Sequence, residues 1–220
     1  HIPTTHRAAK PNDVWMWDIS CLPTRTIGQH YYLYMIEDLY SRCSVHWEVH
    51  ESESGELASE LISQAVLKRS ELGEMRVLHS YNGSPMKSFT MRAKLEALGI
   101  KPSYSRPRVS DDNPYIELMF RTVKYCPQWP SQGFADIESA RDWVTAFMRW
   151  YNEEHRHSAL RFVTPRQRYQ REDHVLLEQH RTVYQTAKAR NPNRWYSDTR
   201  NWRPIGNLAL NPGKETPLAA

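Results

Sequence analysis

The order of apolar and polar positions along the first fifty residues predicts three neighbouring strands. Large apolar, aromatic and β-branched residues fill three short runs, at 14–19, 30–36 and 43–49, which is the composition of β-strands. Gly28 marks a turn between the first two runs, and a short polar segment joins the second to the third. Because the runs follow one another so closely, we expect an antiparallel meander.

Beyond the third run, some segments space their apolar residues as helices do and others as strands do. Asn113 and Pro114 resemble a helix N-cap followed by proline at the first helical position, and Asp136 caps the next helix. Gly99 is placed to end a helix. The pattern predicts helices at 56–69, 91–98, 114–124 and 137–151 and short strands at 75–79 and 100–105. This order is typical of an α/β domain with a mixed sheet.

The two ends of the chain are less regular. Residues 1–12 are expected to be an extended lead-in, and the pattern weakens after Pro165, although 175–189 fits another helix. From Asn191 the chain is rich in Asn, Pro, Arg and Trp, with one alternating stretch at 205–210. We expect either a small β-type tail or a loosely ordered arm.

Composition excludes several classes of protein. The 220 residues have a mean hydropathy of -0.74, and no apolar run approaches the roughly 20 residues of a membrane helix. No membrane association is expected. The three cysteines are widely spaced and form no C-x-x-C pair, which favours neither a disulfide framework nor a cysteine zinc site and is consistent with a cytoplasmic protein. The chain starts at His1 without a signal segment, so we expect it to be part of something longer.

Charge is distributed unevenly along the chain. The formal net charge is +4. Residues 1–154 hold 17 basic and 20 acidic residues, whereas 155–220 hold 12 basic and 5 acidic ones. A basic block with interleaved Tyr and Trp suits nucleic acid, and a solvated basic tail explains it equally well.

Two carboxylates stand out against their local patterns. Asp18 ends a run of large apolar residues, where a buried carboxylate needs a partner, a metal or water. Glu117 lies one turn into a predicted helix, with Arg121 and Lys124 following on the same face. These residues fit a metal-binding carboxylate beside two phosphate-binding cations. The same residues also fit purely structural roles. Asp18 could be an ordinary aspartate at the end of a strand, and Glu117 could form an i,i+4 salt bridge with Arg121.

Seven segments together are more specific than either carboxylate. They resemble, in order, the catalytic core of bacterial insertion-sequence transposases with a retroviral-integrase-like core, and the match extends from about residue 10 to residue 170. The segments are Trp15–Ser20, Tyr32–Arg42, Leu78–Met86, Ser105–Glu117, Phe120–Tyr125, Trp150–Ser158 and Phe162–Arg168.

This resemblance implies a ribonuclease H-like fold: a mixed five-stranded sheet flanked by helices, here with a small basic C-terminal extension. It implies DNA strand cleavage and joining at element ends, through attack by water or a 3′-hydroxyl without a covalent enzyme intermediate. Three carboxylates of such a core hold two divalent ions, Mg²⁺ or Mn²⁺. Asp18 would be the first and would bridge both ions, and Glu117 would be the third. The resemblance also implies homo-oligomers on paired DNA ends, a bacterial cytoplasm with nucleoid association when DNA is bound, and a helix-turn-helix region ahead of the core.

One position departs from the family pattern. The second carboxylate of the family lies in a Ser-Asp-Asn-Gly loop with 35 residues before the Glu, and here that position is Tyr81. A phenol has a reference pKa of about 10 and offers one neutral oxygen where hard divalent ions prefer an anion. Asp111, Asp112 and His79 are poor substitutes. We therefore expect weakened metal binding by Asp18 and Glu117, and little or no strand transfer.

Other polar and aromatic residues remain open candidates. His155 and His157 suggest a metal pair only weakly, because no cysteine is near. Trp143, Trp150 and Tyr151 have helical spacing that favours core packing over base stacking. Six cations are candidate DNA contacts, with a solvated surface as the alternative: Lys101, Arg106, Arg108, Arg121, Lys124 and Arg156.

We therefore expect three parts, a lead-in at 1–12, an integrase-like core at 13–170 and a basic extension at 171–220. The primary hypothesis is an impaired transposase core. The competing hypothesis is a noncatalytic DNA-binding remnant or regulator derived from a transposase. A nuclease acting on RNA in a hybrid is a third hypothesis, which depends on fold analogy alone.

Overall fold

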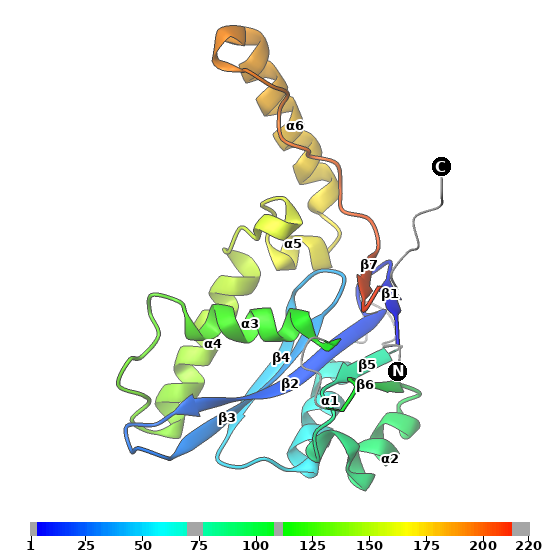
Figure 1. Cartoon of the computed structure of the whole chain (residues 1–220), viewed down its shortest axis with the longest axis vertical. Coiled ribbons are helices and arrows are strands. Elements are labelled where there is room, and N and C mark those ends of the chain that lie inside the picture. Colours follow the sequence, from blue (N-terminus) through cyan, green and yellow to red (C-terminus); the bar gives the residue numbers. More distant parts are fainter. Residues whose placement is uncertain (1–3, 70–76, 108–111, 213–220) are drawn as a thin grey trace.

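A mixed sheet forms the centre of the computed structural model, which describes residues 4–69, 77–107 and 112–212. Among these residues, five strands pair in the order β4-β3-β2-β5-β6 (Figure 1). The first three, β2 (Val14–Pro23), β3 (His30–Asp38) and β4 (Ser44–His50), are antiparallel neighbours. β5 (Val77–Ser80) pairs parallel to β2, and β6 (Lys101–Tyr104) pairs parallel to β5. The predicted meander and mixed sheet are confirmed, apart from residues 75 and 76, which lie outside the described part.

Helices cover both faces of the sheet because β2 is apolar on both sides. Met16 and Leu22 belong to a core cluster with α3 (Pro114–Lys124) and α4 (Ile137–Glu153). Trp15 and Trp17 point the other way, since successive residues of a strand alternate, and join a second cluster. That cluster includes buried residues of α1 (Gly55–Arg69) and α2 (Phe89–Ala97). The four helices are those that the sequence predicts.

The three predicted helix ends are confirmed, although one N-cap residue makes no side-chain hydrogen bond. Gly99 follows α2 with φ of 66°, the left-handed conformation that glycine adopts without strain. Asp136 and Ser139 form a reciprocal capping box at α4. Asn113 precedes α3, but its side chain makes no capping hydrogen bond, and within the described residues its amide atoms are buried without a partner. Pro114 at the first helical position still fixes where α3 begins.

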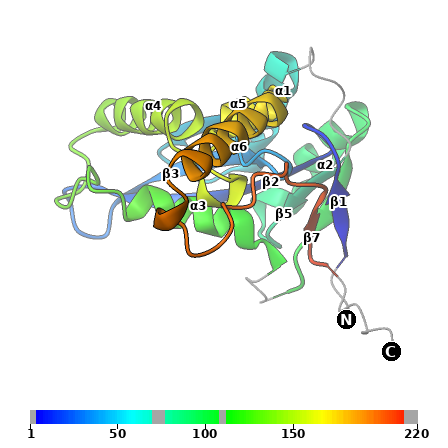
Figure 2. The same cartoon turned by 90° about the horizontal axis from the view of Figure 1, so that it is seen from above.

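The C-terminal third forms a projecting helix and a returning segment. After α5 (Pro165–Tyr169), the helix α6 (Asp173–Arg190) extends away from the sheet, and the following chain runs back along it (Figures 1 and 2). Short 3₁₀ turns occur at Pro85–Lys87, Ser158–Leu160 and Pro192–Arg194. No described helix is both long and apolar enough to span a membrane.

The two ends of the described chain pair with each other. β1 (His6–Ala8) runs antiparallel to β7 (Leu208–Leu210). The Asn211 side chain donates to the backbone oxygen of Asp112 at 3.0 Å, and the Tyr115 hydroxyl donates to that of Ala209 at 3.1 Å. The lead-in and the tail are therefore held against the start of α3, and the alternating stretch at 205–210 contains a strand as predicted.

One buried arginine connects the sheet, α6 and the tail. Arg168 is 1% exposed, and its guanidinium donates to Asp173 at 2.7 Å and to the backbone oxygen of Tyr40 at 2.8 Å. It also donates to the backbone oxygens of Ile205 and Gly206 at 3.0 and 3.2 Å. Asp173 is fully buried as well. Its carboxylate supplies the counter-charge that offsets the cost of burying the Arg168 cation.

Replacing Asp173 with alanine should therefore destabilise the protein by about 3–5 kcal/mol, because it leaves the Arg168 cation buried without its counter-ion. Urea unfolding followed by circular dichroism measures this change. The matched control is Glu178→Ala, which breaks the exposed pair with Arg181 and should cost less than about 1 kcal/mol. Equal losses in the two variants would contradict the structural role assigned to Arg168.

Candidate active site

Strand pairing places position 81 beside Asp18. Asp18 lies midway along β2, and the preceding pair across the parallel β2–β5 ladder is Trp17 with Ser80. Tyr81 follows directly after β5, so it comes next to Asp18 in the same register. Asp18 alternates with Met16 and thus belongs to the face on which α3 packs. Glu117 lies in the first turn of α3, so three distant segments meet where β5 ends.

The electrostatics of Asp18 show that Glu117 is near. Burial is the main cause that raises the pKa of Asp18 to about 7, and the negative charges of Glu117 and Glu53 raise it further. The backbone N–H of Ile19, 2.9 Å from the carboxylate, acts in the opposite direction. A buried acid beside other acids holds its proton until a cation or water compensates the charge. Asp18 and Glu117 therefore form a pair that would favour a bound cation.

Glu53 was not predicted from the sequence. It lies between β4 and α1, is exposed, and has no motif around it that marks a site. Its relation to Asp18 depends on the sheet bringing β2 close to the end of β4, which is a long-range arrangement.

Tyr81 does not supply the missing charge. Its ring packs against the apolar cluster on the α1 and α2 side of the sheet, although the strand register would direct a continuing residue toward α3. The tyrosine thus behaves as a partly buried core residue. The next residue, Asn82, has a side-chain oxygen that is buried without a hydrogen bond in the described part of the chain.

The donor set does not fit the three-carboxylate, two-ion centre that the sequence resemblance implies. Asp18 and Glu117 are hard oxygen ligands suited to Mg²⁺ or Mn²⁺. At the position of the second carboxylate, however, stands Tyr81, whose ring packs against the apolar cluster. Within the described residues, no group of three or more His, Cys, Asp or Glu side chains is arranged to hold a metal ion.

The nearby alternatives are engaged elsewhere. Asp112 accepts two hydrogen bonds from the Arg106 guanidinium, both at 2.9 Å, and one from the Arg106 backbone at 2.8 Å. His79 faces Ser103 at 2.9 Å, and burial together with the charge of His6 lowers the pKa of His79 to about 4. Asp111 lies outside the described residues. Asp112 and His79 are therefore structural here.

Five of the six predicted DNA-contacting cations lie in the described part of the chain, on or just after β6, on α3 and after α4. Lys101 begins β6, whereas Arg106 follows its end and pairs with Asp112. Arg121 and Lys124 are exposed on α3, and the Arg121 guanidinium lies over the Tyr125 ring at 5.9 Å. Arg156 is exposed and donates to Gln167 at 3.1 Å. Arg108 lies outside the described residues.

The aromatic and histidine candidates belong mainly to one ring stack on α4 and the turn after it. Tyr151 is buried, and Trp143 stacks on Phe147 at 5.4 Å and packs against the core, as the helical spacing predicts. Trp150 is the exception, since 39% of it is exposed. The His155 and His157 rings lie 5.6 Å apart beside Tyr151. Burial lowers the pKa of both histidines, that of His157 to about 4.

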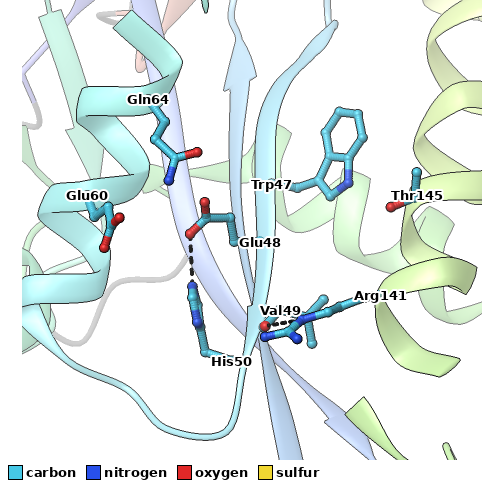
Figure 3. A pocket seen from close by; sticks show the side chains of 8 residues that line it. All are labelled: Trp47, Glu48, Val49, His50, Glu60, Gln64, Arg141 and Thr145. Carbon is cyan, nitrogen blue, oxygen red and sulfur yellow. Dashed lines mark hydrogen bonds and ion pairs between the residues drawn. The ribbon is translucent and has the colours of Figure 1, made fainter. Parts of the chain in front are cut away.

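A separate hollow with a volume of about 370 Å³ lies at the edge strand β4 and is lined by residues of β4, α1 and α4 (Figure 3). Glu48, one of its two acidic residues, lies 2.9 Å from His50, and hydrogen bonds from His46 and His50 lower the pKa of Glu48. Arg141 donates to the backbone oxygen of Val49 at 3.2 Å. β4 is at the opposite edge of the sheet from β5 and β6, so this hollow is distinct from the Asp18 site.

Comparison with known proteins decides the family. Two models described as "Integrase core domain" match residues 8–110 and 98–165. The chain belongs to the integrase core family.

Its curated relatives are transposases of bacterial insertion sequences. The putative transposase InsK of IS150 from Escherichia coli K12 is 27% identical over 159 residues, which are 72% of this chain and 55% of InsK. The IS904 transposase of Lactococcus lactis is 25% identical over 160 residues, 73% of this chain and 62% of its own length.

Solved structures share the fold of this integrase core at low sequence identity. A chain of the simian T-cell lymphotropic virus intasome matches with a TM-score of 0.61 at 16% identity, covering 77% of this chain and 58% of that one. The HTLV-2 integrase core in complex with magnesium, in its dimeric form, matches at 0.54 and 17% identity, covering 73% and 97%. The Mos1 mariner transposase catalytic domain matches at 0.51 and 13%, covering 62% and 70%. The ribonuclease H-like fold is thereby confirmed, while this integrase core spans little more than half of its curated transposase relatives.

The raised pKa of Asp18 predicts a specific pH dependence of stability. Its folded pKa of about 7 exceeds the unfolded value of about 3.9, so the folded state binds the proton more tightly and loses stability as pH rises from about 4 through 7. Asp18→Asn removes this loss. The variant should match the parent near pH 4 and exceed it by about 4 kcal/mol at pH 8.

Urea unfolding at several pH values tests this expectation. Glu37 and Asp38 also have pKa values raised by burial, to about 8 and about 6, but they are present in both proteins and cancel in the difference. A stability difference between parent and Asp18→Asn that stays constant from pH 4 to pH 8 would contradict the assignment.

Proposed function

We propose that this integrase core is the catalytic domain of a bacterial DNA transposase that acts on element ends, and that Tyr81 severely reduces its strand cleavage and transfer. One observation supports the impairment above all. Tyr81 directly follows the Trp17–Ser80 pair, and its ring packs against the apolar cluster on the α1 and α2 side.

Asp18 and Glu117 are the residues proposed to hold a divalent cation, Mg²⁺ or Mn²⁺. Such a cation, when bound, would supply Lewis-acid activation of a phosphodiester. The chain itself would provide two anionic ligands, provided that Asp18 releases the proton that burial and Glu117 favour. A neutral phenol in place of the second anion leaves the cation under-compensated, so metal affinity should be low.

DNA and further copies of the chain are the proposed partners. The cationic C-terminal third, with 12 basic and 5 acidic residues, suits the phosphate backbone. Dimeric and trimeric forms of the HTLV-2 integrase core have been solved, which supports assembly of this chain into homo-oligomers on DNA.

A noncatalytic DNA-binding remnant is the second candidate. The same packing of Tyr81 favours it, since a residue that fills a core position stabilises the fold without contributing to chemistry. This candidate predicts DNA binding that falls steeply with salt and gains little from Mg²⁺.

Tyr81→Asp should restore the missing anion. Nicking of supercoiled plasmid with Mg²⁺ or Mn²⁺ should be at background for the unmodified chain and should rise at least about 100-fold in the variant, because even indirect partners of a metal site contribute 10–100-fold. Titration calorimetry with Mn²⁺ should show a parallel gain in affinity.

Tyr81→Asn is the matched control, since it has the size of aspartate without its charge and should restore neither property. Robust nicking by the unmodified chain would contradict the proposed impairment. Failure of Tyr81→Asp to gain Mn²⁺ affinity would contradict the assigned position of residue 81.

A further inference from the structure

An open hollow of about 650 Å³ lies away from the Asp18 site, where the lead-in meets the start of α6. Three separate segments of the chain line it. The turn at 9–13 forms one side, Tyr40 follows β3 and forms the back, and Arg171 with His174 comes from the junction of α5 and α6.

Two cationic side chains and one imidazole gather at this hollow. Lys10, Arg171 and His174 are exposed, and in the part of the chain that the structure describes their side-chain nitrogen atoms enter no ion pair or hydrogen bond. Asp13 is the acidic residue of the lining. One of its carboxylate oxygens is already occupied by the backbone N–H groups of Ala9 and Lys10, at 2.9 and 3.0 Å. Lys10 and Arg171 are two positive charges against the single negative charge of Asp13, so the lining has a net positive charge.

The back of the hollow is rigid. Tyr40 is 6% exposed and packs on the Arg168 guanidinium, 4.1 Å from the ring centroid, and Arg168 is fixed by Asp173. Burial raises the pKa of Tyr40, so its hydroxyl remains a hydrogen-bond donor at neutral pH, and the charge of Arg171 acts on it.

Arg171 is held in place by its backbone. It has φ of 61° and its N–H donates to the Arg168 oxygen at 3.0 Å. Its backbone is therefore fixed beside Tyr40 by the turn that opens α6.

We propose that this hollow binds a phosphate group through Lys10, Arg171, His174 and the hydroxyl of Tyr40. An ammonium, a guanidinium, an imidazole and a phenol supply donors from several directions, which suits the oxygens of a phosphate. The phosphate belongs either to a DNA backbone or to a free phosphate ion. The first case rests on the proposed function, because the hollow lies at the base of the basic C-terminal third.

Fluorescence anisotropy with a short labelled DNA duplex, measured over a range of salt concentrations without divalent metal, tests the DNA case. Lys10→Gln and Arg171→Gln should each weaken binding and should each reduce the slope of log K against log salt by about 0.9, since one phosphate contact is lost. The double variant should lose about twice that slope.

Arg149→Gln is the matched control, because Arg149 is exposed on α4 and its side chain enters no ion pair or hydrogen bond among the described residues. It removes the same charge at a different place and should change the slope less. Thermal melting should be unchanged in all four variants, since none of the residues is buried. An equal effect of the control would show that only net charge matters and would overturn the proposal.

Titration calorimetry with inorganic phosphate separates the two sources. A reduced DNA slope assigns the hollow to the DNA backbone, whereas an unchanged slope with lost binding of inorganic phosphate assigns it to a free ion. If neither property changes, the hollow is not a phosphate site. Both measurements are independent of residue 81, so they remain informative whether or not Tyr81→Asp restores cleavage.

Discussion

The pairing of β2 on both of its edges is the constraint on which the rest of the structure depends. Antiparallel pairing with β3 and parallel pairing with β5 fix the register of β2 completely, and a slip of one residue would exchange the Met16 and Trp17 faces. That register brings position 81 beside Asp18 and turns Asp18 toward α3. The positions of Asp18 and of α3 relative to each other therefore depend on this register.

The buried charge of the Asp18 site lowers the stability of the fold that contains it. Asp18 is charged at neutral pH only against the cost of burial and the repulsion of Glu117 and Glu53. The neighbouring acids Glu37 and Asp38 are fully enclosed, although Asp38 is compensated by the Ser41 hydroxyl and by backbone N–H groups of Ser41 and Asn12. An aromatic ring at position 81 has the opposite effect, because it adds apolar packing where a carboxylate would add repulsion. Such a substitution is easily tolerated by the fold.

Short-range sequence patterns predicted the helices and strands. Contacts between residues far apart in the sequence could not be predicted from such patterns. The strand runs, Gly99 and Asp136 are short-range features, so the meander and the helix ends could be read from the sequence. The position of Tyr81 came from its spacing to Glu117 within a familiar motif. The proximity of Glu53 to Asp18, the buried contacts of Arg168 and the pairing of β1 with β7 join residues far apart in sequence, and no local pattern marks them. Asn113 occupies the predicted N-cap position of α3 without capping it, because a favourable residue type does not ensure that its side chain turns toward the helix.

The β1–β7 pair has a consequence for chain entropy. Joining two strands separated by roughly 200 residues costs about 5 kcal/mol in loop closure, and a ladder of three residue pairs does not offset that cost unaided. The two strands therefore meet because Arg168, Tyr115 and Asn211 have already brought the tail to the core. This short ladder opens locally while the core stays folded, so the exchange of the β7 amide protons with solvent reports on local opening and not on global unfolding.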